Sequence, residues 1–112
     1  MIGHSANETR RKVIAMYLVV SYWEPVPGHE AEFERAGTEV RAVLKAQPGM
    51  DLLEVFESNG KRVAVHGYRD EAAYNAIVND PEGPFAKAVA AAHMEDHAKW
   101  ISSDRGTTRS ND

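Results

Sequence analysis

The chain has 112 residues, which suits one compact domain and leaves little room for a second. Apolar residues make up 43% and charged residues 27% of it, proportions typical of globular rather than disordered proteins. Thirteen Lys and Arg residues against seventeen Asp and Glu residues give a formal net charge of −4, so nucleic acid is not an expected partner. Cysteine is absent, which excludes disulfides and thiolate chemistry and fits a cytoplasmic location.

The first predicted element is a strand at residues 13–23. This segment is rich in β-branched and aromatic residues, and Pro25, Pro27 and Gly28 follow it. Its uninterrupted apolar run, residues 13–20, is far shorter than the roughly 20 residues that a membrane-spanning helix needs. The chain is therefore not expected to associate with a membrane.

Two further patterns follow in the chain. Apolar residues from Phe33 to Leu44 recur at helical spacing, which predicts a helix over residues 29–47 that ends before Pro48-Gly49. The dipeptide Asn59-Gly60 separates two apolar segments, and it is a strong hairpin signal because both turn positions need positive φ. Residues 50–58 and 61–68 are therefore predicted to pair as antiparallel strands.

The C-terminal third predicts two helices and a short strand. Asp70 can cap a helix that runs to about Val78, and Pro84 suits the first turn of a helix that reaches about Lys99. Trp100 and Ile101 are then expected to begin a last short strand. Residues 1–12 and 102–112 hold almost no large apolar side chains, so a flexible arm and a flexible tail are expected around one domain at 13–101.

This order of elements predicts an α+β fold, a ferredoxin-like split βαβ unit with an antiparallel sheet and its helices on one face. The strands carry apolar residues on both faces, whereas an antiparallel sheet with one bare face should alternate apolar with polar residues. A second subunit is therefore expected to cover the other face. We predict a homodimer in which two sheets pack face to face as an eight-stranded barrel.

Several segments together resemble the antibiotic biosynthesis monooxygenase family of dimeric α+β barrels. They are the apolar first strand, the run 27–33 (PGHEAEF), the helix end 47–50 (QPGM), the Asn-Gly hairpin and the run 68–74 (YRDEAAY). The resemblance covers roughly residues 13–90. It implies a pocket inside each subunit, between sheet and helices, and places Val20 toward that pocket.

The family's functional positions match only in part. The family usually has tryptophan where Tyr68 stands here, and Tyr74 matches a tyrosine of the polyketide-oxidising branch, whose asparagine on strand three falls near Ala64. The asparagine and histidine of the heme-degrading branch fall near Val20 and near residues 77–79. A heme-binding or heme-degrading protein is therefore a less favoured alternative.

Candidate catalytic residues follow from strand parity. His66 and Tyr68 share one face of the third strand, and an imidazole can accept a phenolic proton while a tyrosine hydroxyl orients the oxyanion. Leu18, Val20 and Tyr22 share one parity of the first strand and, with Tyr74, are the expected substrate-binding residues. The alternative is that the histidine and the tyrosines are packing residues.

The expected function is a small cofactor-independent monooxygenase that acts on an aromatic, quinol or polyketide-like substrate. No cofactor is expected. His93 and His97 are four residues apart on the predicted last helix, but a zinc or iron site needs a third ligand, so no metal is expected there. The alternative is a non-redox ligand-binding or polyketide cyclase-type protein on the same fold.

Overall fold

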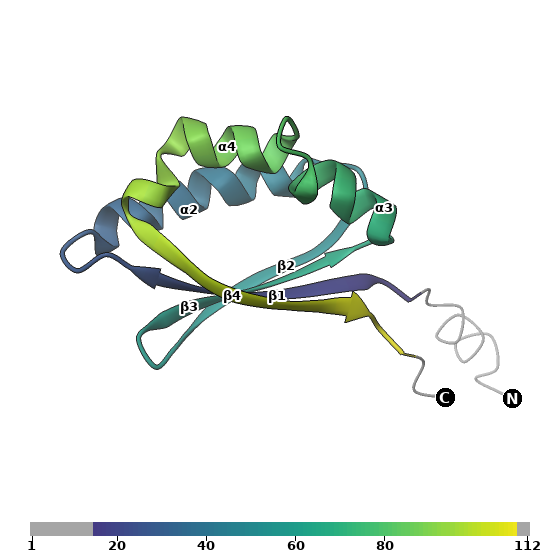
Figure 1. Ribbon diagram of the computed structural model, residues 1–112, viewed down its shortest axis with the longest axis horizontal. Coiled ribbons are helices and arrows are strands. Elements are labelled where there is room, and N and C mark those ends of the chain that lie inside the picture. Colours follow the sequence, from purple (N-terminus) through teal and green to yellow (C-terminus); the bar gives the residue numbers. More distant parts are fainter. Residues whose placement is uncertain (1–14, 110–112) are drawn as a thin grey trace, which may run out of the picture.

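The computed structural model describes residues 15–109, in which two helices cover one face of a four-stranded sheet (Figure 1). The strands are β1 (Tyr17–Pro25), β2 (Met50–Ser58), β3 (Lys61–Tyr68) and β4 (Ala98–Thr107). The helices are α2 (Glu30–Lys45), α3 (Glu71–Tyr74) and α4 (Pro84–Ala92), with a π-helical turn η1 (Asn75–Asn79) and a 3-10 turn η2 (Met94–Asp96).

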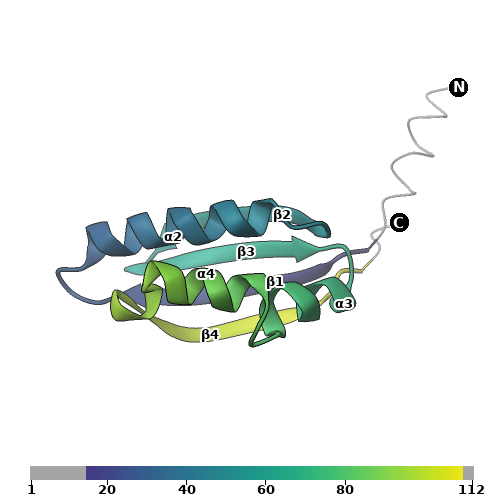
Figure 2. The same ribbon diagram turned by 90° about the horizontal axis from the view of Figure 1, so that it is seen from above.

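The strand order in the sheet is β2-β3-β1-β4, and every neighbouring pair is antiparallel. Seen from above, α2 and α4 lie side by side across the sheet (Figure 2). This arrangement confirms the predicted α+β, ferredoxin-like fold. No helix in the described part of the chain is both long and apolar enough to cross a membrane.

The local signals for α2, the hairpin and α3 act as predicted. The helix α2 buries one apolar stripe that includes Phe33, Val40 and Leu44. Asn59 and Gly60 have φ values of 53° and 76°, the left-handed geometry that this tight turn requires. At the start of α3 the Asp70 carboxylate accepts a hydrogen bond of 2.8 Å from the Ala73 amide.

The C-terminal third departs from the prediction. Because His93 adopts φ 53°, helix α4 ends at Ala92 and does not reach Lys99. Strand β4 then runs for 10 residues, so residues 102–107 form a strand and not the expected flexible tail. Their side chains carry little strand propensity, but their backbone completes the otherwise open edge of β1.

The structure describes only part of the segments that were expected at the two ends of the domain. The first strand begins at Tyr17 and not at residue 13, and residues 13 and 14 lie outside the described range. The expected N-terminal arm at 1–12 lies outside it as well, as do residues 110–112 of the expected tail.

The two faces of the sheet differ in how far one chain covers them. On β1 the buried residues Tyr17, Val19 and Trp23 face the helices. The opposite face, here called the outer face, is formed by the alternate residues of each strand, which point away from the helices. It remains partly exposed, and Phe56 on it is 52% exposed. The outer face is mostly apolar and, except for the buried Val63, its large apolar residues are at least partly exposed in the one chain. Its members include Met16, Leu18, Val20, Tyr22, Leu52, Phe56, Val63 and Val65.

Candidate functional site

A cavity of about 320 Å³ lies between the sheet and the helix layer. Its wall is mainly apolar and includes Phe33, Val40 and Leu44 from α2 and Phe85 from α4. An apolar hollow of this size, with a few polar groups directed into it, is typical of a small-molecule site.

The antiparallel register arranges the cavity side of the sheet in rows. The first row joins His66 of β3, Val19 of β1 and Arg105 of β4. The next row toward the hairpin joins Ala64, Ser21 and Ser103 in the same order. A third row joins Arg62, Trp23 and Trp100. Each of these residues contacts the cavity, so β1, β3 and β4 build one continuous wall.

His66 and Tyr68 form a hydrogen-bonded pair at this wall. The Nδ1 atom of His66 lies 2.8 Å from the Tyr68 hydroxyl oxygen, and His66 is 8% exposed. Nε2 of His66 has no hydrogen-bond partner among the described residues. Every fully buried side-chain nitrogen or oxygen in the described residues does have a partner, so Nε2 is not fully buried. The Nε2 atom is therefore open to the cavity.

Burial sets the protonation states of this pair. It lowers the pKa of His66 from 6.5 to about 4, so the imidazole is neutral at neutral pH. Burial, together with the neighbouring Tyr74, raises the pKa of Tyr68 above its ordinary value. Tyr68 therefore remains a neutral phenol that fixes the orientation of the His66 ring.

Aromatic contacts hold Tyr68 in place. Tyr68 is 0% exposed, and its ring centroid lies 5.4 Å from that of Tyr74, in an edge-to-face arrangement. Tyr74 in turn lies 5.2 Å from Tyr17 and contacts the cavity. His66 and Tyr74 thus line the cavity, as predicted from the sequence. Tyr68 does not line it, but its hydroxyl is hydrogen-bonded to His66, which does.

The remaining predicted residues lie elsewhere. Leu18, Val20 and Tyr22 point to the outer face, and none of them contacts the cavity. The face assigned to them is therefore corrected: the register pairs Val19, not Val20, with His66. Both parities of β1 are apolar, so composition could not distinguish its two faces.

A polar chain in the cavity wall was not predicted from the sequence. The indole Nε1–H of Trp100 donates to Ser103 Oγ at 2.9 Å, and the Ser103 hydroxyl donates to Ser21 Oγ at 3.0 Å. Ser21 is 7% exposed. A serine within the apolar run of β1 was the available signal for Ser21, but its partner Ser103 lay in residues predicted to be a tail.

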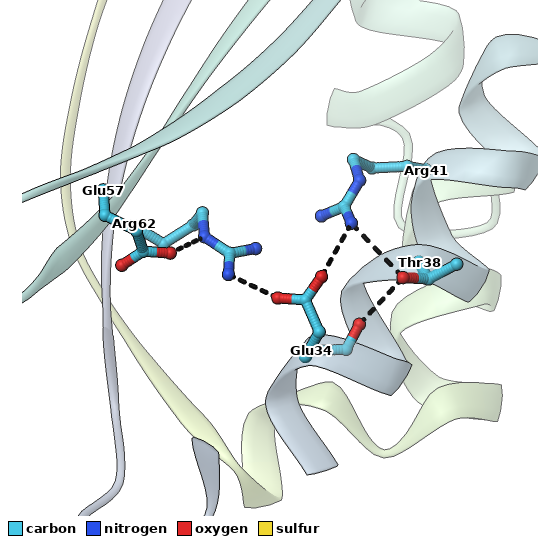
Figure 3. A network of polar contacts seen from close by, with 5 residues as sticks. All are labelled: Glu34, Thr38, Arg41, Glu57 and Arg62. Atoms are coloured by element: carbon cyan, nitrogen blue, oxygen red, sulfur yellow. Dashed lines mark hydrogen bonds and ion pairs between the residues drawn. The ribbon is translucent and has the colours of Figure 1, made fainter. Parts of the chain in front are cut away.

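Two arginines at the α2 side of the cavity take part in an ion-pair network (Figure 3). Arg62 bonds both Glu57 and Glu34, while Arg41 lies 3.7 Å from Glu34 and donates to Thr38 Oγ1 at 3.3 Å. The hydrogen bond from Arg62 lowers the pKa of the Glu34 carboxyl group. The Arg62 guanidinium is therefore paired with protein carboxylates, and its bond to Glu34 links β3 to α2.

His93 and His97 do not form a helical pair. His93 ends α4 in left-handed geometry and lies 3.7 Å from Asp96, whereas His97 Nδ1 lies 3.0 Å from Nδ1 of His29. Within residues 15–109 no three His, Asp or Glu side chains are grouped so that they could hold a metal ion. The contact between His29 and His97 instead joins the loop before α2 to the start of β4.

The fold and the cavity define a small ferredoxin-like α+β protein with an internal ligand-sized site. The sequence model of the antibiotic biosynthesis monooxygenase family matches residues 16–91, and the chain belongs to this family. No curated protein matches the sequence significantly.

Solved structures with the same fold share little sequence with this chain. SnoaB, a cofactor-independent oxygenase from Streptomyces nogalater, is 19% identical with a TM-score of 0.65, over 88% of this chain and 96% of SnoaB. A Caulobacter crescentus CB15 protein described under the same family name is 20% identical with a TM-score of 0.66, over 96% and 99%. Rv0793 from Mycobacterium tuberculosis is 14% identical with a TM-score of 0.65, over 87% and 96%. At these identities the likeness establishes the fold alone.

Proposed function

We propose that the protein is a cofactor-independent monooxygenase that acts on an aromatic, quinol or polyketide-like substrate. The observation that carries the proposal is the open Nε2 atom of His66 in an apolar cavity, with Nδ1 held by Tyr68. Membership of the family and the fold shared with SnoaB support the same reaction class. His66 is the catalytic residue in this proposal, Tyr68 positions it, and Tyr74 contacts the substrate ring.

The reaction needs an electron-rich phenol or enol that can pass an electron to oxygen as its anion. The substrate proton passes to Nε2 of His66, with Nδ1–H donating to the Tyr68 oxygen. The anion gives an electron to O₂, a carbon–oxygen bond forms as a peroxide, and loss of water leaves a carbonyl. In total a CH₂ group and O₂ become C=O and H₂O, so the substrate itself supplies the electrons.

The low pKa of His66 limits which substrates fit this proposal. A base with a pKa of about 4 deprotonates ordinary phenols poorly, whereas conjugated polyketide enols are more acidic. An anion formed beside the imidazolium also raises the pKa of His66 in the complex. We expect kcat/KM to fall on the acid side only near pH 4, below the ordinary histidine range.

The proposal includes a homodimer and a cytoplasmic location. The partly exposed outer face, which includes Val20, Val65 and Phe56, supports the dimer, because a second copy of the same apolar sheet would remove it from water. Since the cavity lies on the opposite side of the sheet, the dimer leaves each cavity within one chain.

Oxygen uptake against a panel of hydroquinones, naphthols and anthrones tests the activity. We expect His66→Gln to lower kcat about 100-fold and Tyr68→Phe to lower it about tenfold, as loss of a proton acceptor and of its positioning partner would. The matched control is Tyr22→Phe, which removes a hydroxyl on the outer face and should keep kcat within about twofold of the wild type. No uptake by the wild type on any compound would contradict the proposal.

A non-redox ligand-binding or cyclase-type protein is the second candidate. The weak basicity of His66 favours it, since a neutral imidazole can also donate a hydrogen bond to a carbonyl group without redox chemistry. Product mass separates the two candidates. Gain of oxygen supports the oxygenase, whereas loss of water or an unchanged ligand supports the second candidate.

A further inference from the structure

Strand β4 supplies polar residues to the cavity from outside the segment that matches the family. The family match ends at residue 91, whereas β4 begins at Ala98. Trp100, Ser103 and Arg105 all contact the cavity, and Trp100 is 50% exposed while Arg105 is also exposed. The cavity therefore opens to solvent along β4, and these side chains belong to its mouth.

The hydroxyl chain at this mouth holds one more hydrogen than it uses. Trp100 and Ser103 each donate one hydrogen bond, and Ser21 accepts the second of them. The hydroxyl hydrogen of Ser21 has no acceptor among the described residues. A ligand oxygen in the cavity can supply that acceptor, and a buried donor favours one that does.

Arg105 adds a positive charge to the same side of the cavity. Its guanidinium carbon lies 5.9 Å from the ring centroid of Tyr74, and it makes no ion pair with residues 15–109. By contrast, Arg62 bonds two glutamates and Arg41 contacts one of them (Figure 3). Of these three cavity arginines, Arg105 is therefore the one without a carboxylate partner among residues 15–109.

We propose that Arg105 and the Ser21–Ser103 pair form a carboxylate-binding subsite at the mouth of the cavity. Ser103 and Arg105 lie two residues apart on one face of β4, and both present donors to the cavity. A carboxylate accepts two guanidinium hydrogen bonds and a hydroxyl hydrogen bond, whereas a neutral ring has no use for the charge. The substrate is thus an aromatic or polyketide-like acid whose carboxylate faces β4 while its ring lies near His66 and Tyr74.

This inference rests on the proposed function, because it narrows the substrate class of the same cavity. Its test is therefore a binding measurement without turnover. Calorimetry under anaerobic conditions at pH 7 compares 1,4-dihydroxy-2-naphthoate with its uncharged methyl ester. We expect the wild type to bind the acid about tenfold more tightly than the ester, as one charge-assisted contact would give.

Variants assign that preference to the subsite. Arg105→Gln should weaken binding of the acid about tenfold and change binding of the ester less than about twofold. Ser21→Ala should weaken acid binding about threefold, as loss of one neutral donor would. The matched control is Lys99→Gln, which removes a charge from β4 at an exposed position away from the cavity and should keep the preference.

Equal binding of acid and ester by the wild type would overturn the subsite, as would a preference that survives Arg105→Gln. Oxygen uptake distinguishes this failure from failure of the proposed function. Selective binding of the acid, with no oxygen uptake on any compound of the panel, upholds the subsite and contradicts the oxygenase. Oxygen uptake with both the ester and the acid, together with equal affinity for the two, upholds the oxygenase and contradicts the subsite.

Discussion

At the scale of single residues, the neutral imidazole of His66 is the feature on which the proposed chemistry depends. Its pKa falls to about 4 because the side chain is buried between the sheet and the helices. The Tyr68 hydroxyl holds one ring nitrogen and leaves the other open to the cavity. The same burial that shapes the reactive group must also make the fold sensitive to acid.

We predict that the burial of His66 makes the folded protein less stable at acid pH. The folded pKa lies below the unfolded value of 6.5, so the contribution is complete above pH 6.5 and is lost as the pH falls toward 4. A change from 6.5 to about 4 corresponds to about 3 kcal/mol in the free energy of unfolding. Urea denaturation from pH 7.5 to 4 should show this loss in the wild type.

The control is His66→Gln, which keeps a hydrogen-bonding group next to Tyr68 but does not titrate. Other groups titrate equally in both proteins, so the difference between their stability curves isolates His66. Parallel curves over this pH range would contradict the predicted shift.

At the scale of elements, the sequence correctly predicted the features that depend on interactions between neighbouring residues. The apolar stripe of α2, the Asn59-Gly60 turn and the Asp70 cap are each fixed by neighbours in the sequence, and all three form as predicted. Strand β4 was predicted too short because its order comes from pairing with β1, some 80 residues away in the chain. Long-range pairing leaves little trace in the composition of a strand.

The same reasoning explains how much of the site could be predicted. His66 was singled out because it shares the parity of Tyr68 on the third strand, and Tyr74 because it matches a tyrosine of the polyketide-oxidising branch of the family. Val19 and Ser21 were missed because the register of β1 against β3 decides which parity faces the cavity. Ser103 and Arg105 were missed because they lie in the part of β4 that was predicted to be a flexible tail.

Close packing between η1 and α4 yields a prediction at this scale. A Cβ atom at Gly83 would lie 2.7 Å from the backbone oxygen of Ala76, and backbone cannot move aside as a side chain can. We predict that Gly83→Ala lowers the free energy of unfolding by about 2 kcal/mol and shifts the cavity wall at Val78 and Phe85.

Urea denaturation of Gly83→Ala measures this effect, with Glu82→Ala as its neighbouring control. Glu82 is exposed, so its replacement should change stability by less than about 0.5 kcal/mol. Equal stability of the two variants would show that η1 and α4 do not pack as described.

At the scale of the whole molecule, the two faces of the sheet have separate roles. The helix-facing side encloses the cavity, while the outer face presents partly exposed apolar residues that include Leu18, Val20 and Val65. Each large apolar side chain loses roughly 1.5–3 kcal/mol when it remains in water. A sheet-to-sheet homodimer would remove this cost without closing the cavity mouth along β4.

We predict that the wild type is a dimer at micromolar concentration in light scattering. Val65→Glu places a charge at the centre of the outer face and should yield a folded monomer, because the residue is only partly buried in one chain. Val43→Glu is the matched control, since Val43 is an exposed apolar residue on α2 and its replacement should leave the dimer intact. A monomeric wild type would contradict the proposed assembly.

The fate of molecular oxygen tests the central claim most directly. Purified protein free of metal and flavin is incubated with ¹⁸O₂ and an aromatic acid that has an oxidisable CH₂ group, and product and water are analysed by mass spectrometry. The proposed reaction predicts one labelled atom in the new carbonyl group and the other in water, and both signals should appear about 100-fold more slowly in His66→Gln. A product without label, or labelling by His66→Gln at the rate of the wild type, would contradict it.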